Sequence, residues 1–310
     1  MKQQNFKILL AFGAIYIIWG STYLATRFAI ETIPPLTMIG IRSLAAGIIL
    51  FSISRSRNEE TIKRENIIPL VALGAMFFLI GHGLLAWSQQ YVPSGNAAVL
   101  VTPEPLWIMG LEWFFLKDTK IKIKGISGLL LGFVGVVFLI TLTAGNDVVK
   151  NNILGSVLIV VSTISWGAGA VYSRVASVPK SPILTSAMEL IFGGILVLIT
   201  SCIIGEQSHF HLTQVTLKSI FGLLYLIVFG SVVAFSAYVW LLGRTSVTKI
   251  STHTYINPVI AVFLGWLFAN EKITLGLSIS TVIIIISVYI VLSDKGQDSK
   301  KNSIRQSSSS

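Results

Sequence analysis

Residues 15–27 read IYIIWGSTYLATR and residues 162–174 read STISWGAGAVYSR, so a Trp-Gly pair and a closing Arg recur 147 positions later. The same offset relates Pro35 to Pro182 and Gly47 to Gly194. An offset of 153 relates a further set: Trp87 to Trp240, Pro105 to Pro258, Trp113 to Trp266, and Asp118 to Glu271. The shift of six fits a longer polar loop in the second copy. Compositional bias explains these paired positions less well than an internal duplication does.

Each copy contains five apolar segments. Stretches of about 20 apolar residues can cross a hydrocarbon core of about 30 Å. In lipid such segments must be helices, because every backbone polar group needs an internal partner. With 53% hydrophobic and 12% charged residues, the chain cannot cover a soluble surface. The sequence therefore predicts an all-α polytopic membrane protein with ten transmembrane helices, at 8–27, 35–53, 67–88, 97–116, 124–143, 153–174, 183–204, 218–241, 248–269 and 273–292.

The odd number of spans in each copy predicts the organisation of the chain. It forces the second copy to enter the bilayer from the opposite side, which gives two inverted five-helix repeats. We expect a cytoplasmic N-terminus (1–7), a first repeat (8–143), an external linker (144–152), a second repeat (153–292) and a disordered cytoplasmic tail (293–310).

The net charge of +10 is distributed as in a membrane protein rather than a nucleic-acid-binding one. Most Lys and Arg residues fall on the predicted cytoplasmic side, as the positive-inside rule requires. The loop after Asp118 carries three lysines in six residues, whereas its counterpart after Glu271 carries one. We therefore expect a multi-pass protein of a prokaryotic cytoplasmic (inner) membrane, with both termini cytoplasmic and no nucleic-acid partner.

Motifs for other functional classes are missing from the sequence. It contains no Walker-type glycine loop and no HExxH or paired-cysteine spacing, so neither a nucleotide nor a metal site is predicted. The single cysteine, Cys202, excludes an internal disulfide. We expect no cofactor and no metal, so any driving force must come from an ion or substrate gradient.

The duplicated motifs carry a family resemblance. A Trp-Gly pair lies early in the first helix of each copy, and Pro105 to Asp118 and Pro258 to Glu271 repeat a Pro-x12-Asp/Glu spacing. In this order they resemble the EamA-type transporters of the drug/metabolite transporter superfamily. The resemblance implies ten helices, of which the first four in each half line a central cavity. It also implies export or exchange of small metabolites, amino acids among them.

Ionisable residues inside the predicted helices are the first candidates for a site, because each costs about 2.5–3.5 kcal/mol at the bilayer centre. Arg42 and Glu104 lie at nearly the same depth from the outer face, so we expect a structural Arg42–Glu104 ion pair. Their equivalents in the second half are Glu189 and Asn257. Glu189 then lacks a cationic partner, and we expect it to carry a proton or to bind the substrate.

Two histidines are further candidates. His82 and His253 lie within predicted helices, and His253 shares a helix face with Asn257. An unperturbed histidine titrates near pH 6.5, which suits proton coupling. Hydrogen-bonded packing is the alternative for both.

Aromatic residues predict the cavity wall. Tyr16, Trp19 and Tyr23 follow one another at three- and four-residue spacing and form one stripe on the first helix. Trp166 repeats Trp19 in the sixth helix, and Trp107 lies near Glu104 in the fourth. Such a wall with few polar anchors suits a metabolite pocket, whereas helix packing is the alternative.

Together these features favour a secondary transporter that exports or exchanges a small polar metabolite, amino acid or amine-like, by alternating access between two inverted repeats. The expected partners are the substrate, with a proton or a counter-substrate, and membrane lipid. A small-residue face at 125–135 also leaves a homodimer open. A membrane-embedded enzyme would need a nucleophile, a base and an orienting group clustered in the bilayer. A scaffold would need long extramembrane segments, and the sequence contains neither feature.

Overall fold

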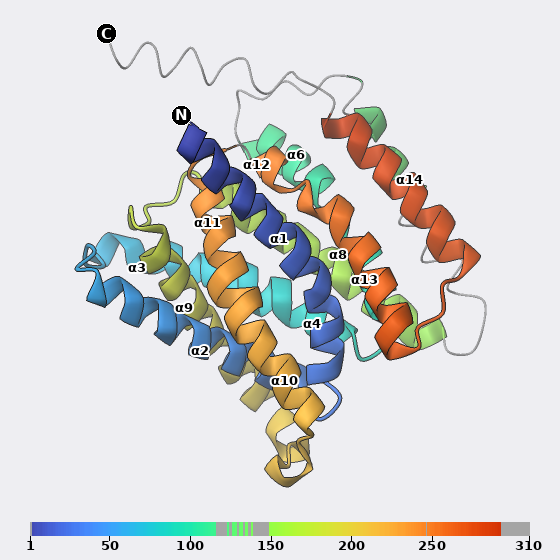
Figure 1. The fold of residues 1–310 in the computed structure, drawn as a ribbon, viewed down its shortest axis with the longest axis horizontal. Coiled ribbons are helices and arrows are strands. Elements are labelled where there is room, and N and C mark those ends of the chain that lie inside the picture. Colours follow the sequence, from blue (N-terminus) through green and yellow to red (C-terminus); the bar gives the residue numbers. More distant parts are fainter. Residues whose placement is uncertain are drawn as a thin grey trace.

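The computed structural model describes residues 2–115, 149–245 and 247–292, with scattered positions between 123 and 138. Within these residues every regular element is helical and there is no strand (Figure 1). Six helices are long and apolar enough to cross a membrane, and two shorter apolar helices accompany them. These helices confirm the all-α polytopic class. Most of the predicted linker, much of the fifth segment, Asp118 and the tail at 293–310 lie outside the described residues.

The helices follow the order of the predicted segments. The third and the eighth segments each form one continuous helix with a π-helical centre, and the fourth and ninth are divided in two. The elements are α1 (Lys2–Ala29), α2 (Pro35–Ser56), α3 (Arg64–Gly74), η1 (Ala75–Gly83), α4 (Leu84–Ser88), α5 (Ser94–Val101), α6 (Glu104–Phe115), α8 (Val149–Tyr172), α9 (Pro182–Ile203), the 3-10 turns η2 (Glu206–His209) and η3 (Leu212–Gln214), α10 (Leu217–Tyr225), η4 (Leu226–Phe235), α11 (Ser236–Leu242), α12 (Val247–Ile250), α13 (His253–Ala269) and α14 (Leu275–Leu292).

Prolines fix where the membrane helices begin and break. Pro35 and Pro182 occupy the first turns of α2 and α9, where the missing N–H group is not needed for helical hydrogen bonding. Pro103 separates α5 from α6, because proline cannot donate the bond that would continue the helix. The break makes Glu104 the first residue of α6.

The contact between α2 and α9 is symmetric, because equivalent residues of the two helices make equivalent contacts. A Cβ atom on Gly47 would lie 2.7 Å from Cγ1 of Ile191, and one on Gly194 would lie 3.0 Å from Cγ of Leu44. The offset of 147 relates Gly47 to Gly194 and Leu44 to Ile191. Residues that match in the sequence therefore make matching contacts, as in an interface between two equivalent partners.

The two π-helical segments also correspond. Adding 153 to the bounds of η1 gives 228–236, which overlaps η4 at Leu226–Phe235. A π-helix leaves backbone carbonyls with altered partners, and such segments are frequent at functional sites. η1 carries His82, and η4 carries Gly230 and Ser231, which hold two side chains of the candidate site.

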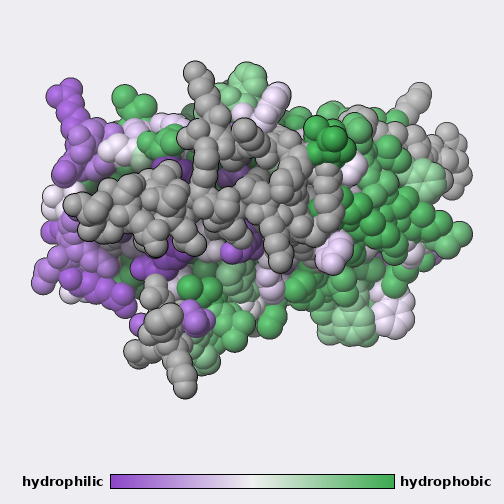
Figure 2. All heavy atoms as spheres, turned by 90° about the horizontal axis from the view of Figure 1, so that it is seen from above, coloured by the Kyte–Doolittle hydropathy of each residue, from purple (hydrophilic) through white to green (hydrophobic). Residues whose placement is uncertain are grey.

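The outer surface is largely apolar, as a lipid-facing surface must be. Figure 2 shows hydrophobic residues over much of the visible face, with hydrophilic residues gathered at one end. Exposed examples are Ile48, Phe114 and Phe221. On the predicted small-residue face, Gly132 packs towards α6 and α14, and Gly135 packs towards α14. At these two positions the small-residue face therefore contacts other helices of the same chain.

Two glycines, Gly74 and Gly193, lie where two helix backbones approach closely, and we expect alanine at either position to destabilise the protein. A Cβ atom on Gly74 would lie 2.7 Å from the Gly193 nitrogen, and one on Gly193 would lie 2.7 Å from the Gly74 oxygen. Because neither main-chain atom can move aside cheaply, we expect Gly74→Ala and Gly193→Ala each to destabilise the protein by about 1–3 kcal/mol. Thermal melting of the purified protein measures the effect. The matched control is Gly13→Ala, since no atom lies within 4 Å of its added Cβ. Wild-type melting of both variants would contradict the expectation.

Candidate substrate-binding site

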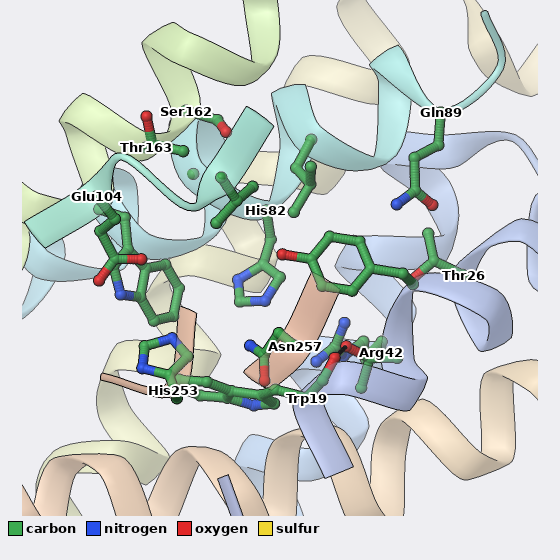
Figure 3. A pocket seen from close by; sticks show the side chains of 16 residues that line it. Trp19, Thr26, Arg42, His82, Gln89, Glu104, Ser162, Thr163, His253 and Asn257 are labelled. Carbon is green, nitrogen blue, oxygen red and sulfur yellow. Dashed lines mark hydrogen bonds between the residues drawn. The ribbon is translucent and has the colours of Figure 1, made fainter. Parts of the chain in front are cut away.

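A central cavity of about 70 Å³ lies among α1, α2, η1, α4, α5, α6, α8 and α13 (Figure 3). At about 10–15 Å³ for each water molecule, it has room for roughly five. The cavity brings together seven of the ten predicted binding residues from both halves of the chain. These are Trp19, Tyr23, His82, Glu104, Trp166, His253 and Asn257.

Additional polar side chains line the same cavity: Arg42, which was predicted as half of an ion pair, and five that were not among the predicted binding residues, Thr22, Thr26, Gln89, Ser162 and Thr163. Thr22 donates to the Trp19 carbonyl oxygen at 2.7 Å, and Ser162 donates to the Ile159 carbonyl oxygen at 2.7 Å. With their protons engaged, these hydroxyls offer the cavity mainly lone pairs. A hydroxyl within one helical turn of each repeated tryptophan is the sequence signal that could have identified them.

The structure contradicts the predicted Arg42–Glu104 ion pair. Arg42 Nε donates to Ser231 Oγ at 2.8 Å, and the salt bridges of the described residues do not include an Arg42–Glu104 pair. Glu104 Oε1 is buried and has no hydrogen-bond partner. The two side chains lie on opposite sides of the cavity (Figure 3). The prediction rested on equal depth along the helices, and depth does not fix the direction in which a side chain points.

The histidines are held by main-chain carbonyls. Nδ1 of His82 lies 3.2 Å from the Phe77 oxygen, and Nδ1 of His253 lies 2.9 Å from the Ile250 oxygen. Since a carbonyl only accepts, Nδ1 is the donor in each case. Both rings also pack against tryptophans, His82 on Trp166 and His253 on Trp19, with centroids 4.9 Å apart in each pair. Packing thus fixes two rings that also face the cavity.

Five aromatic rings pack against one another beside the cavity, and two of them, Trp19 and Trp166, line it. We call the five the aromatic barrier: Trp19, Phe77, Trp166, Phe235 and Tyr238. The Trp166 ring meets Trp19 edge-on at 5.7 Å and lies 4.7 Å from Phe77. The Trp166 indole nitrogen donates to the Tyr238 hydroxyl at 3.2 Å. The Trp19 indole nitrogen donates to the Gly230 carbonyl oxygen at 3.2 Å.

The repeat places side chains of different size at equivalent positions. The offset of 153 relates His82 to Phe235 and Leu85 to Tyr238. Where the first half places an imidazole and a leucine beside the cavity, the second half places two larger rings, and Phe235 and Tyr238 are fully buried. The two halves therefore differ in side-chain size at equivalent positions, and only the smaller pair lines the cavity.

Three predicted residues do not line the cavity. The Tyr16 hydroxyl instead hydrogen-bonds with Thr252 Oγ1 at 2.6 Å. Trp107 has a buried indole nitrogen without a partner, and it packs beside Gly167. Glu189 lines a second cavity, of about 490 Å³, near the end of α8.

The second cavity contains several charges. Glu189 is almost fully buried, and its Oε2 has no hydrogen-bond partner. Arg174 and Lys180 line the same cavity. Nη1 of Arg174 lies 3.7 Å from Oε1 of Glu112, so this arginine already has an acidic neighbour.

Sequence comparison connects this architecture to known proteins. Residues 5–141 and 153–293 each match the EamA-like transporter family. The chain belongs to this family. It is 33% identical to the inner membrane transporter YedA of Escherichia coli (strain K12) over 91% of this chain and 89% of that protein. It is 26% identical to the transporter YoaV of Bacillus subtilis (strain 168), over 92% of this chain and 96% of that protein. It is also 26% identical to PecM of Dickeya dadantii (strain 3937), over 93% of each chain.

A solved crystal structure shows the same fold. It superposes with a TM-score of 0.64 at 18% identity and covers 92% of this chain and 96% of that chain. At this identity the likeness establishes the fold alone. Membership of the EamA-like family indicates a membrane transporter rather than an enzyme.

In this EamA-like chain, a pair of acids that the sequence analysis did not predict joins α2 to α9. Glu206 accepts from the Thr37 nitrogen at 2.9 Å and from Ser201 Oγ at 2.9 Å. Glu59, its equivalent at the offset of 147, accepts from Ser54 Oγ at 2.7 Å and from the Ser181 hydroxyl.

Each of these acids lies near the first turn of a helix in the other half, where a carboxylate meets unpaired N–H groups and a favourable dipole. We call Glu59 and Glu206 the inter-repeat caps. The recurring Ser-x4-Glu spacing is the sequence signal that could have identified them. They fix the starts of α2 and α9, the helices that carry Arg42 and Glu189.

Glu271 positions the broken fourth helix. It accepts from the Ser94 nitrogen at 2.9 Å, the Ser94 hydroxyl at 2.7 Å and the Gly95 nitrogen at 3.0 Å. The carboxylate thus caps α5 from the second half of the chain. Glu271 is the acid of the second Pro-x12-Asp/Glu copy, so in this copy the acid has a structural role. It fixes the start of α5, the segment that leads to Glu104.

Proposed function

We propose that the protein is a secondary transporter that exports or exchanges a small polar metabolite, amino acid or amine-like, across the cytoplasmic (inner) membrane. It works by alternating access between two inverted five-helix repeats, which together make ten spans, and both termini are cytoplasmic. Family membership supports transport, and the name of the relative YedA supports the inner membrane. The observation that carries the proposal is a polar central cavity, lined by residues of both halves, together with a separate second cavity that contains Glu189.

Inverted repeats require equivalent helices to run in opposite directions. Nη1 of Arg27, near the end of α1, donates to the Gln89 oxygen at 2.9 Å. A Cβ atom on Gly155, near the start of α8, would lie 2.7 Å from Cγ2 of Val92. Because Gln89 and Val92 are neighbours, the end of α1 and the start of α8 lie at the same end of the bundle. This antiparallel relation supports inverted repeats.

The two cavities support alternating access. The central cavity extends to Thr26 and Gln89, near the end of α1, whereas the second cavity contains Ser173, which follows the end of α8. These ends lie at opposite ends of the bundle. Phe235 and Tyr238 are buried and line neither cavity, whereas His82 and Leu85, their equivalents in the first half, line the central cavity. Exchanging the roles of the two halves would close one cavity and enlarge the other.

Flux measurements test the proposal. We expect liposomes containing the purified protein to accumulate at least one compound from a radiolabelled panel of amino acids, amines, nucleosides and sugars. Uptake should be saturable and should be stimulated by unlabelled compound inside, and the compound should be recovered chemically unchanged. Protein-free liposomes and liposomes with the Gly13→Ala variant are the negative and positive controls. A chemically altered product would instead support an enzyme, and absence of flux for the whole panel would reject transport.

A further inference from the structure

An ion pair joins the two halves of the chain at the end of the bundle where α8 ends. Nη1 of Arg174, which follows α8, lies 3.7 Å from Oε1 of Glu112 in α6. Nη2 of the same arginine donates to the carbonyl oxygen of Thr245, which follows α11, at 3.3 Å. The side chains of Arg174 and Glu112 are 21% and 6% exposed, so water screens their attraction only in part. Arg174 therefore connects three segments at this end.

Both residues of the ion pair lie two helical turns beyond the central cavity. Glu112 follows Glu104 by eight residues, and Arg174 follows Trp166 by eight residues. Glu104 and Trp166 both line the cavity. Because eight residues of helix span about 12 Å, the ion pair lies at about this distance from the cavity on both segments.

Between the cavity and the ion pair, α6 packs directly against α8. A Cβ atom on Gly167 in α8 would lie 3.2 Å from Cγ1 of Ile108 in α6. Ile108 and Ala170 are fully buried and belong to the same hydrophobic core. A passage along these two helices therefore opens only if α6 separates from α8, and that separation breaks the ion pair.

The opposite end of the bundle has no equivalent ion pair. The repeat offsets relate Arg174 to Arg27 and Glu112 to Gly265. The salt bridges of the described residues do not include Arg27. A Cβ atom on Gly265 would lie 2.5 Å from Oε2 of Glu271, the carboxylate that caps α5. A side chain at Gly265 would displace this cap, so an acid at the position equivalent to Glu112 does not fit there.

We propose that Glu112 and Arg174 form a gate that holds the cytoplasmic end of the transporter closed, and that the transport cycle breaks and remakes their ion pair. This inference rests on the proposed function and names the contact that sets its resting state. Because the external end lacks such a pair, closure of the cytoplasmic end is favoured. The extension of the central cavity to Thr26 and Gln89, near the external end of α1, agrees with this bias.

The surroundings of Arg174 allow the gate to open as well as to close. Arg174 lines the second cavity, so its charge meets water when α6 and α8 separate. Its Nε is buried without a hydrogen-bond partner in the closed gate, and opening gives this donor access to water. Neutralising one member in the closed gate leaves the other charge partly buried without its counter-charge. Either neutralisation should therefore shift the equilibrium towards the open cytoplasmic end.

The sidedness of cysteine labelling in the full-length protein tests the gate. Cys202→Ser removes the single cysteine of the chain, and Ser162→Cys places a reporter in the central cavity. A membrane-impermeant thiol reagent is applied to right-side-out and to inside-out vesicles. With the gate intact we expect labelling mainly from the external side. Glu112→Gln and Arg174→Gln should each raise the labelling rate from the cytoplasmic side by at least about three-fold.

Three further variants distinguish a gate from general loosening of the structure. The combination of Glu112→Gln with Arg174→Gln should raise cytoplasmic labelling no further than the larger single effect, because both changes remove one interaction. Arg174→Lys should have a smaller effect than Arg174→Gln, since it keeps the charge. Arg27→Gln, the matched change at the other end, should not raise labelling from the cytoplasmic side.

Cross-linking provides an independent measurement that does not depend on the neutralised variants. Glu112→Cys and Arg174→Cys are combined in the Cys202→Ser background, and bifunctional methanethiosulfonates of graded length join the two thiols. We expect the joined protein to lose flux by more than about ten-fold and to regain it when a reductant releases the linker. Each single-cysteine variant, treated in the same way, should keep its flux.

The outcomes separate the gate from the proposed function. Unchanged cytoplasmic labelling in folded Glu112→Gln and Arg174→Gln, or an equal increase in Arg27→Gln, overturns the gate. The expected changes in labelling without flux of any compound reject transport and keep the gate. Flux that continues unchanged after residues 112 and 174 are cross-linked keeps transport and rejects the gate.

Discussion

Replacement of Trp166 with Ala is expected to destabilise the protein by about 3–5 kcal/mol, the range for removing a large buried ring. Trp166 is the centre of the aromatic barrier and contacts Trp19, Phe77 and Tyr238. The variant loses these ring contacts, its hydrogen bond to Tyr238 and one wall of the cavity. We therefore also expect weaker ligand binding. Thermal melting and binding titrations of the purified variant measure the two effects.

Two variants separate packing from hydrogen bonding. Trp166→Phe keeps a ring but cannot donate to Tyr238, so we expect a loss of about 1 kcal/mol from the missing hydrogen bond and a further loss from the smaller ring. Trp113→Ala removes a tryptophan that is 57% exposed on the outer surface, and it should melt and bind nearly as the wild type does. If Trp166→Ala melted like Trp113→Ala, the barrier would not stabilise the fold.

The repeat was the part of the fold that the sequence predicted best. Duplicated Trp-Gly pairs placed Trp19 and Trp166 at matched depth, and both indeed line one cavity. The matching contacts of Gly47 and Gly194 follow from the same duplication. Depth along a helix is readable from the sequence because the rise per residue is constant.

Rotation about the helix axis and packing between distant helices were not readable in this way. Arg42 and Glu104 were predicted to lie at one depth, yet they lie on opposite sides of a cavity, and Ser231 from η4 binds Arg42 instead. No periodic pattern within α2 or α6 identifies a partner on η4. The prediction of an ion pair rested on depth alone, which does not fix the direction of a side chain.

The inter-repeat caps show a second limit of prediction from the sequence. Glu59 and Glu206 lie in polar loops, where an acid ordinarily faces water and needs no explanation. Their structural use depends on the first turns of α9 and α2, more than a hundred residues away in the sequence. Only the recurrence of Ser-x4-Glu at the repeat offset could have drawn attention to them.

The repeat also singles out Glu189 as a residue whose substitution tests the proposed transport. It occupies in the second half the place that Arg42 occupies in the first, and it lines the second cavity with Arg174 and Lys180. No salt bridge of the described residues includes Glu189, and its Oε2 is unpartnered. A buried acid in this position needs a proton or a cation, and a substrate ammonium that passes the aromatic barrier would supply one.

Glu189→Gln is accordingly expected to lower flux into liposomes by about ten- to a hundred-fold at low substrate concentration, because a charge-assisted hydrogen bond is worth about 1.5–3 kcal/mol. The melting temperature should stay the same or rise, since the amide keeps the shape of the side chain and removes an unpaired buried carboxylate. Glu65→Gln, which neutralises an exposed acid, is the matched control and should transport normally. A structural acid would show the opposite pattern, with a lower melting temperature and flux that falls only with the amount of folded protein. Wild-type flux from folded Glu189→Gln would remove Glu189 from the transport cycle.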